Sequence, residues 1–247
     1  MTPQALRLLS GGAAHGLVAS LSAQFKSMTG LDIDGEFSAV GAMAAKLEAG
    51  DAADLVVLTR AIIADLAGRG LVVSDTVADL GTVETSVAVR AGDPPVSTPD
   101  ASSLRAALLA AEEIFVPDTK ASTAGIHVAK VLDRLGIANE VAGRLKVYPN
   151  GATAMRQLAA SGAARAVGCT QSTEIISTQG VRLCDPLPDG YELATVYTAA
   201  VTSRAGQADA AKRLIALLTA ADSRALRAKA GFLEIQSVFE RSGHRFA

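Results

Sequence analysis

The run LRLLSGGAAHG, from Leu6 to Gly16, decides the fold of this chain. A short apolar segment ends at Ser10-Gly11-Gly12, and an amphipathic helical pattern follows it as far as Gly30. A strand that turns through glycines into a helix leaves free backbone N–H groups at the helix start, where the helix dipole adds partial positive charge. The run therefore predicts a site for a small anion. The alternative interpretation is a tight strand-to-helix turn without a ligand.

Composition indicates a globular chain with a sizeable core. Of 247 residues, 49% are apolar and 19% are charged. Aromatic residues make up only 4% and Trp is absent, which disfavours stacking platforms for nucleic acid bases or sugar rings. The net charge of −2 provides no basic field. We therefore expect no nucleic-acid partner and no membrane insertion, and an anion would have to be held by local dipoles and hydrogen bonds.

The N-terminus shows no signal-peptide pattern, because Arg7 and the glycines interrupt the only candidate apolar region. The sequence as written predicts a cytoplasmic protein, or a periplasmic one if it is a trimmed mature form. Cys169 and Cys184 lack the spacing of a zinc or redox motif, and both are interpreted as buried apolar residues. We expect no metal and no cofactor.

The pattern of strand, small-residue turn and helix recurs along the chain. Apolar strand patterns lie at 31–37, 54–58, 113–116, 145–148 and 164–169, and each is followed by small or polar residues and a helical pattern. Extended strands near 83–90 and 192–201 link the two sets of units. We predict an α/β fold with two lobes, each a mixed, mostly parallel sheet flanked by helices, with a hinge and an interlobe cleft. The first lobe comprises 1–84 and 195–247, with the C-terminal helices in the return segment, and the second lobe comprises 85–194.

Three further segments carry a resemblance to a known family: KLEAGDAADL at 46–55, TAGI at 123–126 and TVYTAAV at 195–201. With the opening strand and helix, their order and spacing resemble the type 2 periplasmic solute-binding proteins, and within them the molybdate/tungstate-binding proteins. The resemblance extends from Leu6 to about Phe232. It implies two lobes that close over a small oxyanion held by Ser and Thr hydroxyls, backbone N–H groups and one Tyr. It also implies the membrane subunits of an ABC transporter as partners.

Three positions depart from the pattern of that family. Ala13 stands where the family has a Ser, Ser38-Ala39-Val40-Gly41 replaces a Ser-rich run, and Gln171 stands where the family has its Tyr. Each good hydrogen bond to a charged group contributes about 1.5–3 kcal/mol, so the loss of hydroxyl donors weakens the binding of molybdate. We therefore expect a carboxylate metabolite as the ligand rather than molybdate.

Ligands of doubly wound sheets bind at the carboxyl ends of strands, where the small-residue turns of this chain fall. The residues expected to bind the ligand are Ser10, Gly11, Gly12, Ala13, Ser38, Val40, Gly41, Arg60, Thr123, Ala124, Gly125, Asn150, Gly151, Ala152, Thr170 and Gln171. Arg60 could hold a carboxylate in a bidentate fork, or it could be a solvated arginine at a helix start. Ser172 or Thr173 is the expected N-cap of a short helix, in which Glu174 compensates the dipole.

The same resemblance leaves an enzyme open, because some relatives of the molybdate-binding family isomerise unsaturated tricarboxylates such as aconitate. Such an isomerase would remove and return an allylic proton with one base and no cofactor. His15, in the first turn of the first helix, and His127 are the candidate bases, and a structural role is the alternative for each. Lys120 is interpreted as a surface residue, and His244 is given no role. Binding protein and isomerase both remain hypotheses at this point.

Overall fold

The computed structural model describes residues 5–235, and His244 lies outside them. The chain divides into two compact units. Unit 1 comprises residues 1–83 and 195–247, and unit 2 comprises 84–194. One boundary falls inside strand β4 (Ala78–Arg90) and the other at the start of strand β9 (Ala194–Val201). Because unit 1 is built from two separate segments, the chain passes between the units twice.

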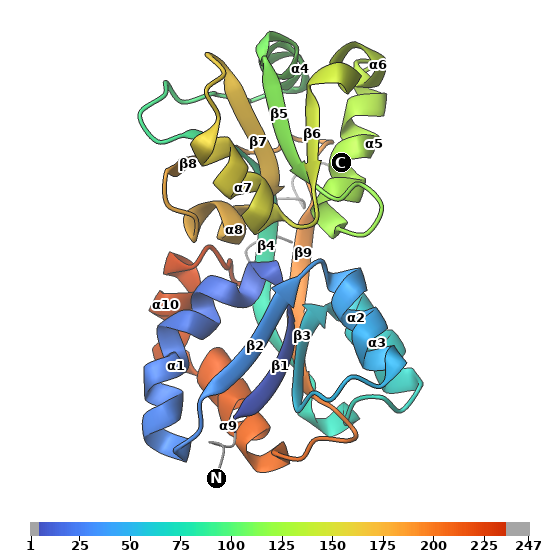
Figure 1. The fold of residues 1–247 in the computed structure, drawn as a ribbon, viewed down its shortest axis with the longest axis vertical. Coiled ribbons are helices and arrows are strands. Elements are labelled where there is room, and N and C mark those ends of the chain that lie inside the picture. The colour runs from blue at the N-terminus through green and yellow to red at the C-terminus, as the bar shows by residue number, and fades with distance from the viewer. Residues whose placement is uncertain (1–4, 236–247) are drawn as a thin grey trace, which may run out of the picture. The chain divides into compact units, whose positions relative to one another are not determined.

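Unit 1 has a mixed sheet in which β1 (Leu6–Gly11) lies between β2 (Ile33–Ser38) and β3 (Leu55–Thr59), both parallel to it. Strand β9 pairs antiparallel with β3. In Figure 1, α1 (His15–Thr29) lies on one side of these strands, with α2 (Val40–Ala49) and α3 (Arg60–Gly68) on the other. The return segment adds α9 (Ala208–Thr219) and α10 (Arg224–Lys229). Short 3-10 turns are at Gly12–Ala14, Ser74–Thr76 and Ala221–Ser223.

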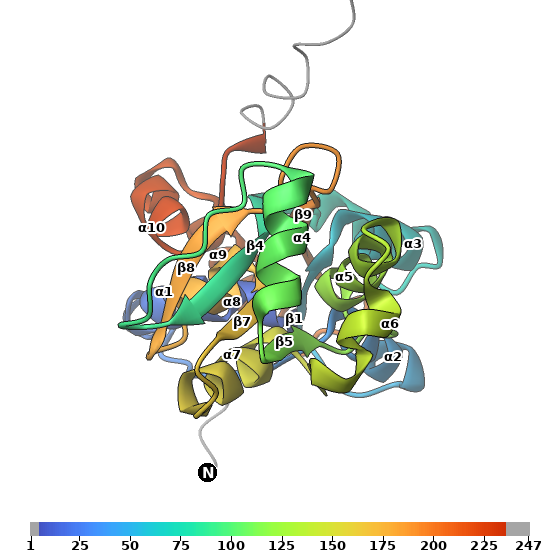
Figure 2. The same ribbon diagram turned by 90° about the horizontal axis from the view of Figure 1, so that it is seen from above.

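Unit 2 has a second mixed sheet, in which β5 (Glu113–Pro117) lies parallel between β6 (Leu145–Tyr148) and β7 (Ala166–Gln171). The end of β4 pairs antiparallel with β7 and with β8 (Val181–Pro186), a strand that the sequence did not suggest. The helices are α4 (Ala101–Ala110), α5 (Thr123–Arg134), α6 (Ala138–Val141), α7 (Gly151–Ala160) and α8 (Ser172–Ile176), with a 3-10 turn at Ala142–Arg144. Figures 1 and 2 show α5 and α6 on one side of β5, and α7 and α8 on the other.

Each unit has its own apolar core, as the hydrophobic patterns require. The single large cluster of unit 1 is centred on β1, β3 and β9 and on the inward faces of α1, α2 and α9. All five residues of β3 are buried, because helices or neighbouring strands cover both faces of this strand. Unit 2 has one cluster between its sheet and helices α4 and α5, and a smaller one beneath α7. The predicted α/β fold with mixed, mostly parallel sheets flanked by helices is confirmed.

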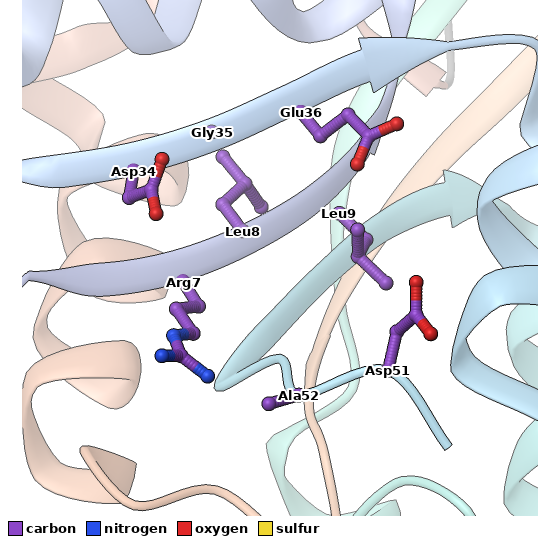
Figure 3. A pocket seen from close by; sticks show the side chains of 8 residues that line it. All are labelled: Arg7, Leu8, Leu9, Asp34, Gly35, Glu36, Asp51 and Ala52. Atoms are coloured by element: carbon purple, nitrogen blue, oxygen red, sulfur yellow. The ribbon is translucent and has the colours of Figure 1, made fainter. Parts of the chain in front are cut away.

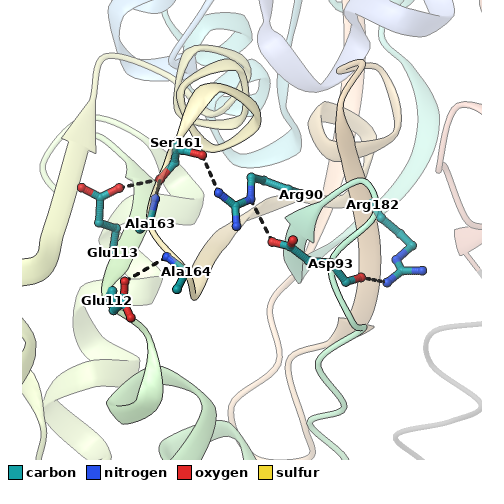
Figure 4. A network of polar contacts seen from close by, with 8 residues as sticks. All are labelled: Arg90, Asp93, Glu112, Glu113, Ser161, Ala163, Ala164 and Arg182. Atoms are coloured by element: carbon teal, nitrogen blue, oxygen red, sulfur yellow. Dashed lines mark hydrogen bonds and ion pairs between the residues drawn. The ribbon is translucent and has the colours of Figure 1, made fainter.

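A network of charged and polar groups fixes the amino end of β5 in unit 2 (Figure 4). Arg90, the last residue of β4, forms an ion pair with Asp93 at 2.9 Å, and its guanidinium also donates to the Ser161 carbonyl. The Ser161 hydroxyl donates to Glu113 at 2.7 Å, at the start of β5. These contacts join the ends of β4 and α7 to the start of β5. The predicted turns lie at the opposite, carboxyl edge of the sheet.

Within residues 5–235, no helix combines the length and the apolar character that crossing a membrane requires.

Candidate functional site

The three predicted turns of unit 1 lie at one edge of its sheet. In the parallel pairing of β1 and β2, Gly11 lies opposite Ser38, and Ser10 lies opposite Val57 of β3. The carboxyl ends of β1, β2 and β3 therefore meet at this edge, and α1, α2 and α3 all begin there. We call it the carboxyl edge of unit 1.

The first turn leaves little room for a side chain at Gly11. A Cβ atom there would lie 2.7 Å from Val40 Cγ1 and 3.0 Å from Tyr197 Cε1, so these side chains would have to shift to admit it. Ser10 is fully buried, and its hydroxyl donates to the Gly11 carbonyl at 2.9 Å. Gly12 and Ala13 form a 3-10 turn before α1, and Ala13 is buried. This turn can therefore offer a ligand backbone N–H groups, but not the Ser10 hydroxyl in its present hydrogen bond.

The second turn of unit 1 offers one side-chain hydroxyl, that of Ser38. Ala39 is the N-cap residue of α2, Val40 is buried and Gly41 is exposed, while Ser38 is half-buried. Within the described part of the chain, no side chain caps the first residues of α1, α2 or α3. The first N–H groups of a helix have no partner inside the helix, so those of α2 and α3 are left for a ligand or for water. Helix α1 differs, because it continues from the 3-10 turn and its first N–H, that of His15, donates to the Gly12 carbonyl.

Arg60, the first residue of α3, already holds a carboxylate of the protein itself. Its Nε donates to Asp79 Oδ1 at 3.1 Å, and Nη2 forms an ion pair with Asp79 Oδ2. Thr198 on β9 also donates to Asp79, at 2.6 Å. Burial opposes ionisation of Asp79, but the hydrogen bonds from Arg60 and Thr198 outweigh it and lower the pKa of this carboxyl. Arg60 thus makes with Asp79 the bidentate contact that was predicted for a ligand carboxylate. The sequence did not predict a role for Asp79 or Thr198.

The two candidate bases differ in what surrounds them. His15 is exposed as the first residue of α1, and its ring meets the Phe37 ring edge-on at 4.8 Å between centroids. His127 lies on α5 in unit 2, where its Nε2 is 2.7 Å from the Tyr191 carbonyl oxygen. Because a carbonyl oxygen only accepts, Nε2 of His127 carries a hydrogen, and only Nδ1 of this ring is left to accept a proton. Within the described part of the chain, the His15 ring makes no hydrogen bond of this kind to a backbone carbonyl, and it is exposed.

Unit 2 also brings its predicted turns to one edge. Pro117 of β5 lies opposite Tyr148 of β6, and Phe115 lies opposite Gly168 of β7. The carboxyl ends of these parallel strands meet where α5, α7 and α8 begin, which we call the carboxyl edge of unit 2. The residues that sequence placed in this region, Thr123, Ala124, Gly125, Asn150, Gly151, Ala152, Thr170 and Gln171, all lie in or beside these turns.

The turn before α5 is shaped by Asp118, whose carboxylate accepts hydrogen bonds from the backbone N–H groups of Lys120 at 2.7 Å and Ala121 at 2.9 Å. These two backbone bonds lower the pKa of Asp118. A Cβ on Gly125 would overlap the carbonyl oxygens of Pro117 and Asp118, so this glycine serves the packing of α5 on β5. Among the described residues, none caps α5 with its side chain, and Thr123 and Ala124 open the helix uncapped.

The turn before α7 is occupied by the chain itself. The Asn150 side chain caps the helix by accepting from the Thr153 N–H at 2.8 Å. The Glu174 carboxylate accepts from the N–H groups of Gly151 and Ala152 and from the Thr170 hydroxyl, the last at 2.6 Å. A Cβ on Gly151 would overlap this carboxylate. Glu174 thus stands where the sequence predicted an external anion.

Glu174 is 6% exposed, and burial raises the pKa of its carboxyl. The hydrogen bonds from Thr170 and from the N–H groups of Ala152, Gln171 and Gly151 offset part of that rise. The sequence predicted that Glu174 compensates only the dipole of its own helix, α8. In the structure its carboxylate also binds N–H groups at the start of a second helix, α7. Its spacing of four residues from Thr170 is the sequence signal for this contact.

Several buried polar side chains of unit 2 have no protein partner. Among residues 5–235, both amide atoms of Gln171 and the hydroxyls of Thr85, Thr98 and Thr173 lack one. The N-cap residue of α8 is Gln171 rather than Ser172 or Thr173, and its side chain makes no capping bond there. Sequence reasoning missed Thr85, although a Thr between Val83 and Val87 on one face of a strand is a recognisable signal.

A shallow groove of unit 1, about 610 Å³ in volume, contains none of the predicted binding residues (Figure 3). Asp34, Glu36 and Asp51 line it together with Arg7. Glu36 forms an ion pair with Lys46 at 2.7 Å. Three carboxylates against one guanidinium make this groove unsuited to an anion. It is therefore not the predicted site.

Residues 5–235 contain no group of three or more His, Cys, Asp or Glu side chains arranged to hold a metal ion. Cys169 and Cys184 are free thiols. Cys169 is buried as predicted, and burial raises the pKa of its thiol to about 12, whereas Cys184 is only half-buried.

Mixed sheets flanked by helices, with helices that begin at the carboxyl ends of parallel strands, agree with the class of periplasmic-binding-protein-like folds. Within that class, the chain belongs to the family of bacterial extracellular solute-binding proteins, whose model matches residues 6–233. The resemblance stated from the sequence is therefore confirmed at the level of fold and family.

Solved structures agree with this assignment. The periplasmic molybdate-binding protein of Azotobacter vinelandii has a TM-score of 0.77 and 16% identity, with 92% of this chain and 98% of that chain covered. The sulfate-binding protein SubI of Mycobacterium tuberculosis H37Rv has a TM-score of 0.74 and 18% identity, with 97% and 90% covered. At these identities the likeness shows the fold.

A curated relative is an aconitate isomerase of a Pseudomonas species. It is 24% identical to this chain over 224 residues, which cover 88% of this chain and 83% of the relative.

Proposed function

We propose that this protein binds a small anion that carries carboxylate groups. The observation that carries the proposal is the carboxyl edge of unit 1, where three helices begin without a side-chain cap in the described part of the chain. Their first N–H groups are hydrogen-bond donors in a field of partial positive charge. Helix α5 in unit 2 begins in the same way. Membership of a solute-binding family supports a ligand at these turns.

The side chains at these turns favour a carboxylate over molybdate. Ala13 and Ala39 supply no hydroxyl, and the Ser10 hydroxyl is bonded to the Gly11 carbonyl, which leaves the Ser38 hydroxyl in these two turns. The loss of hydroxyl donors weakens the binding of molybdate, because each good hydrogen bond to a charged group contributes about 1.5–3 kcal/mol. The relative named as an aconitate isomerase supports this choice, because aconitate is a tricarboxylate.

The proposed partners are the small anion and the membrane subunits of an ABC transporter. A solute-binding protein signals to such subunits that its ligand is bound. The family assignment supports this partner, and a pull-down of the ligand-loaded protein with the candidate membrane subunits tests it.

A thermal-shift panel tests the ligand class. Molybdate, tungstate, sulfate, phosphate and several di- and tricarboxylates are compared at millimolar concentration. A ligand present at about 1,000 times its Kd adds about 4 kcal/mol of stability. For a chain of this size, that free energy raises Tm by about 10 °C. We expect this rise with a carboxylate. A rise with molybdate or tungstate alone would overturn the proposal.

A pair of variants at Ala39 tests the bare helix start directly. Ala39 has an extended backbone at the N-cap of α2, which suits Asn and Asp equally. Ala39→Asp supplies its own carboxylate to the helix N–H groups, so we expect anion binding to weaken at least tenfold. Ala39→Asn caps the same groups without charge and serves as the matched control, with a smaller loss. Equal affinity in both variants and the wild type would remove α2 from the site.

A second candidate function is isomerisation of an unsaturated di- or tricarboxylate, and the 24% identical aconitate isomerase favours it. In this hypothesis the neutral His15 imidazole takes a proton from the carbon next to the double bond. The electron pair of the broken C–H bond forms a new double bond, and the old one opens towards its far carbon. The imidazolium returns the proton to that carbon, so no oxidant and no cofactor is needed.

Proton NMR of cis- and trans-aconitate in D2O separates binding from turnover. An isomerase interconverts the two and exchanges allylic hydrogen for deuterium, whereas a binding protein leaves both unchanged. We expect His15→Ala to abolish any isomerisation while the thermal shift with carboxylates persists. His127→Ala is the control, because Nε2 of His127 already binds the Tyr191 carbonyl. Full isomerisation in His15→Ala would exclude His15 as the base.

A further inference from the structure

Two buried side chains of unit 2 face the same side of its sheet without protein partners. Thr85 on β4 is 1% exposed and Gln171 at the end of β7 is 3% exposed. They lie directly opposite each other in the antiparallel pairing of the two strands. Side chains in such a pair project to the same face, with Cβ atoms about 4.5–5.5 Å apart. Within residues 5–235, neither the Thr85 hydroxyl nor either amide atom of Gln171 has a hydrogen-bond partner.

The backbones of both residues are held by hydrogen bonds. The Thr85 N–H donates to the Leu193 carbonyl at 2.9 Å, and the Thr85 carbonyl accepts from Leu187 at 3.1 Å. The N–H of Gln171 is bonded to the Glu174 carboxylate. The neighbouring Thr170 hydroxyl is satisfied, since it donates to Glu174. Among the described residues, the buried hydroxyls of Thr98, Thr173 and Thr195 also lack a partner, but Thr85 and Gln171 lie directly opposite each other in the sheet.

Buried polar groups are almost always hydrogen-bonded, and each exception calls for an explanation. The pair lies at the carboxyl edge of unit 2, because Gln171 is the last residue of β7. Ligands of such sheets bind at this edge. A ligand is thus the partner that best accounts for the three unpaired atoms.

The chemistry of the pair restricts what that ligand can be. The amide nitrogen of Gln171 donates two hydrogen bonds, its oxygen only accepts, and the Thr85 hydroxyl can do either. A fully deprotonated oxyanion offers acceptors alone and leaves the Gln171 oxygen unpaired. An ammonium group would bring a positive charge, and the nearby Glu174 carboxylate is already engaged by Thr170 and backbone N–H groups. A neutral hydroxyl beside a carboxylate matches both requirements.

We propose that Thr85 and Gln171 recognise a hydroxyl group on the carboxylate ligand, so that the ligand is a small hydroxycarboxylate. This inference rests on the proposed binding of a carboxylate anion. The ligand carboxylate accepts from the Gln171 amide nitrogen, and the ligand hydroxyl donates to the Gln171 oxygen and accepts from Thr85. Gln171, which the sequence placed in the site for its position alone, becomes the residue that sets specificity, together with Thr85.

Matched ligands that differ by one hydroxyl test the proposal. Isothermal titration compares malate with succinate, and citrate with tricarballylate, on the wild-type protein. We expect the hydroxylated member of at least one pair to bind tenfold or more tightly. Binding of carboxylates without any preference for the hydroxyl would overturn this inference and leave the proposed function intact. Absence of binding by every carboxylate would overturn both.

Variants assign the preference to the pair. Thr85→Val and Gln171→Met replace unpaired polar atoms by apolar ones of similar size, so we expect Tm without ligand to be unchanged or higher. In both variants the hydroxyl preference should fall to within twofold. Thr85→Ser keeps the hydroxyl and should therefore keep the preference for the hydroxylated ligand. If Thr85→Val does not fold, the comparison of Thr85→Ser with Gln171→Met tests the proposal instead.

Thr98→Val is the matched control. Thr98 is equally buried in unit 2 and its hydroxyl also lacks a partner among the described residues, but it lies outside the turns of the carboxyl edge. The preference of Thr98→Val for the hydroxylated ligand should remain that of the wild type. A preference that survives in Thr85→Val and Gln171→Met, or that is lost equally in Thr98→Val, would overturn the assignment.

Discussion

The turn after β1 in unit 1 and the turn after β6 in unit 2 both lead a parallel strand through glycine into a helix, yet they treat the freed N–H groups differently. In unit 1, small apolar residues surround the turn and no side chain within residues 5–235 caps α1. In unit 2, Asn150 and the buried Glu174 bind the first N–H groups of α7. Glycine at a helix start therefore accompanies a helix without a side-chain cap in one unit and close packing against an internal carboxylate in the other.

The largest effect is expected from adding a methyl group to each turn. Gly151→Ala would force the Glu174 carboxylate from its hydrogen bonds, so we expect the unfolding free energy to fall by about 3 kcal/mol. Gly11→Ala meets the side chains of Val40 and Tyr197 and should cost less, about 1–2 kcal/mol. Gly68→Ala, with no described atom within 4 Å, is the control and should be neutral or slightly stabilising. Urea denaturation measures all three, and equal losses in Gly11→Ala and Gly151→Ala would break the comparison.

Next in size is the pH dependence contributed by Glu174. Because the folded state raises the pKa of this carboxyl above its ordinary value of 4.5, the folded state holds the proton more tightly than the unfolded chain. The associated stability is present below pH 4.5 and is lost as pH rises through the raised pKa. Relative to Glu174→Gln, wild-type protein should therefore be most stable near pH 4.5 and less so at pH 8. Urea midpoints of both proteins across this range measure the difference, and a difference that grows with pH would show that the pKa is lowered instead.

Smaller effects are expected at the two side-chain caps of unit 2. Asn150→Ala removes a neutral cap from α7 and should lower the unfolding free energy by about 1 kcal/mol at every pH. Asp100 caps α4 through the Ser103 N–H, and this bond lowers the pKa of Asp100. Its contribution is present at neutral pH and is lost on acidification through that lowered pKa. Thermal unfolding of Asn150→Ala and Asp100→Ala at pH 7 and pH 3 should therefore show a pH-dependent cost in Asp100→Ala alone.

The smallest effect on stability is expected at Arg60 and Asp79. The Arg60 side chain is 49% exposed, and exposed ion pairs contribute about 0.2–1 kcal/mol, so a double-mutant cycle should give a coupling energy in that range. The effect on ligand binding is more informative. Asp79→Asn releases the Arg60 guanidinium and should tighten carboxylate binding several-fold in calorimetry. Unchanged affinity in this variant and in Arg60→Ala would remove Arg60 from the binding site.

The sequence predicted the strand-to-helix turns correctly because glycine placement and apolar periodicity are local signals. Gly11, Ser38 and Thr59 each end a strand, and Gln171 ends β7. The edges that these strands share follow from parallel pairing, which the alternation of strands and helices implies. Family resemblance added the order of the segments along the chain.

The partners of the predicted side chains could not be read from the sequence. Arg60 is 19 residues from Asp79, and Asp79 is 119 residues from Thr198, so only the folded sheet brings these groups together. The contact between Glu174 and the start of α7 likewise depends on the packing of α8 beside α7. Thr85 lies opposite Gln171 because of the register in which β4 and β7 pair. A single sequence does not specify that register.

The division of unit 1 into two segments has a consequence for how the chain folds as it leaves the ribosome. Synthesis completes the whole of unit 2 before β9 exists, and β9 is the partner that covers the free edge of β3. Until then the buried strand Leu55–Thr59 presents unpaired backbone groups between apolar side chains, which is the kind of edge that pairs with other chains. The nascent protein is thus most exposed to aggregation in its first third, and the arrival of Ala194–Val201 ends that exposure.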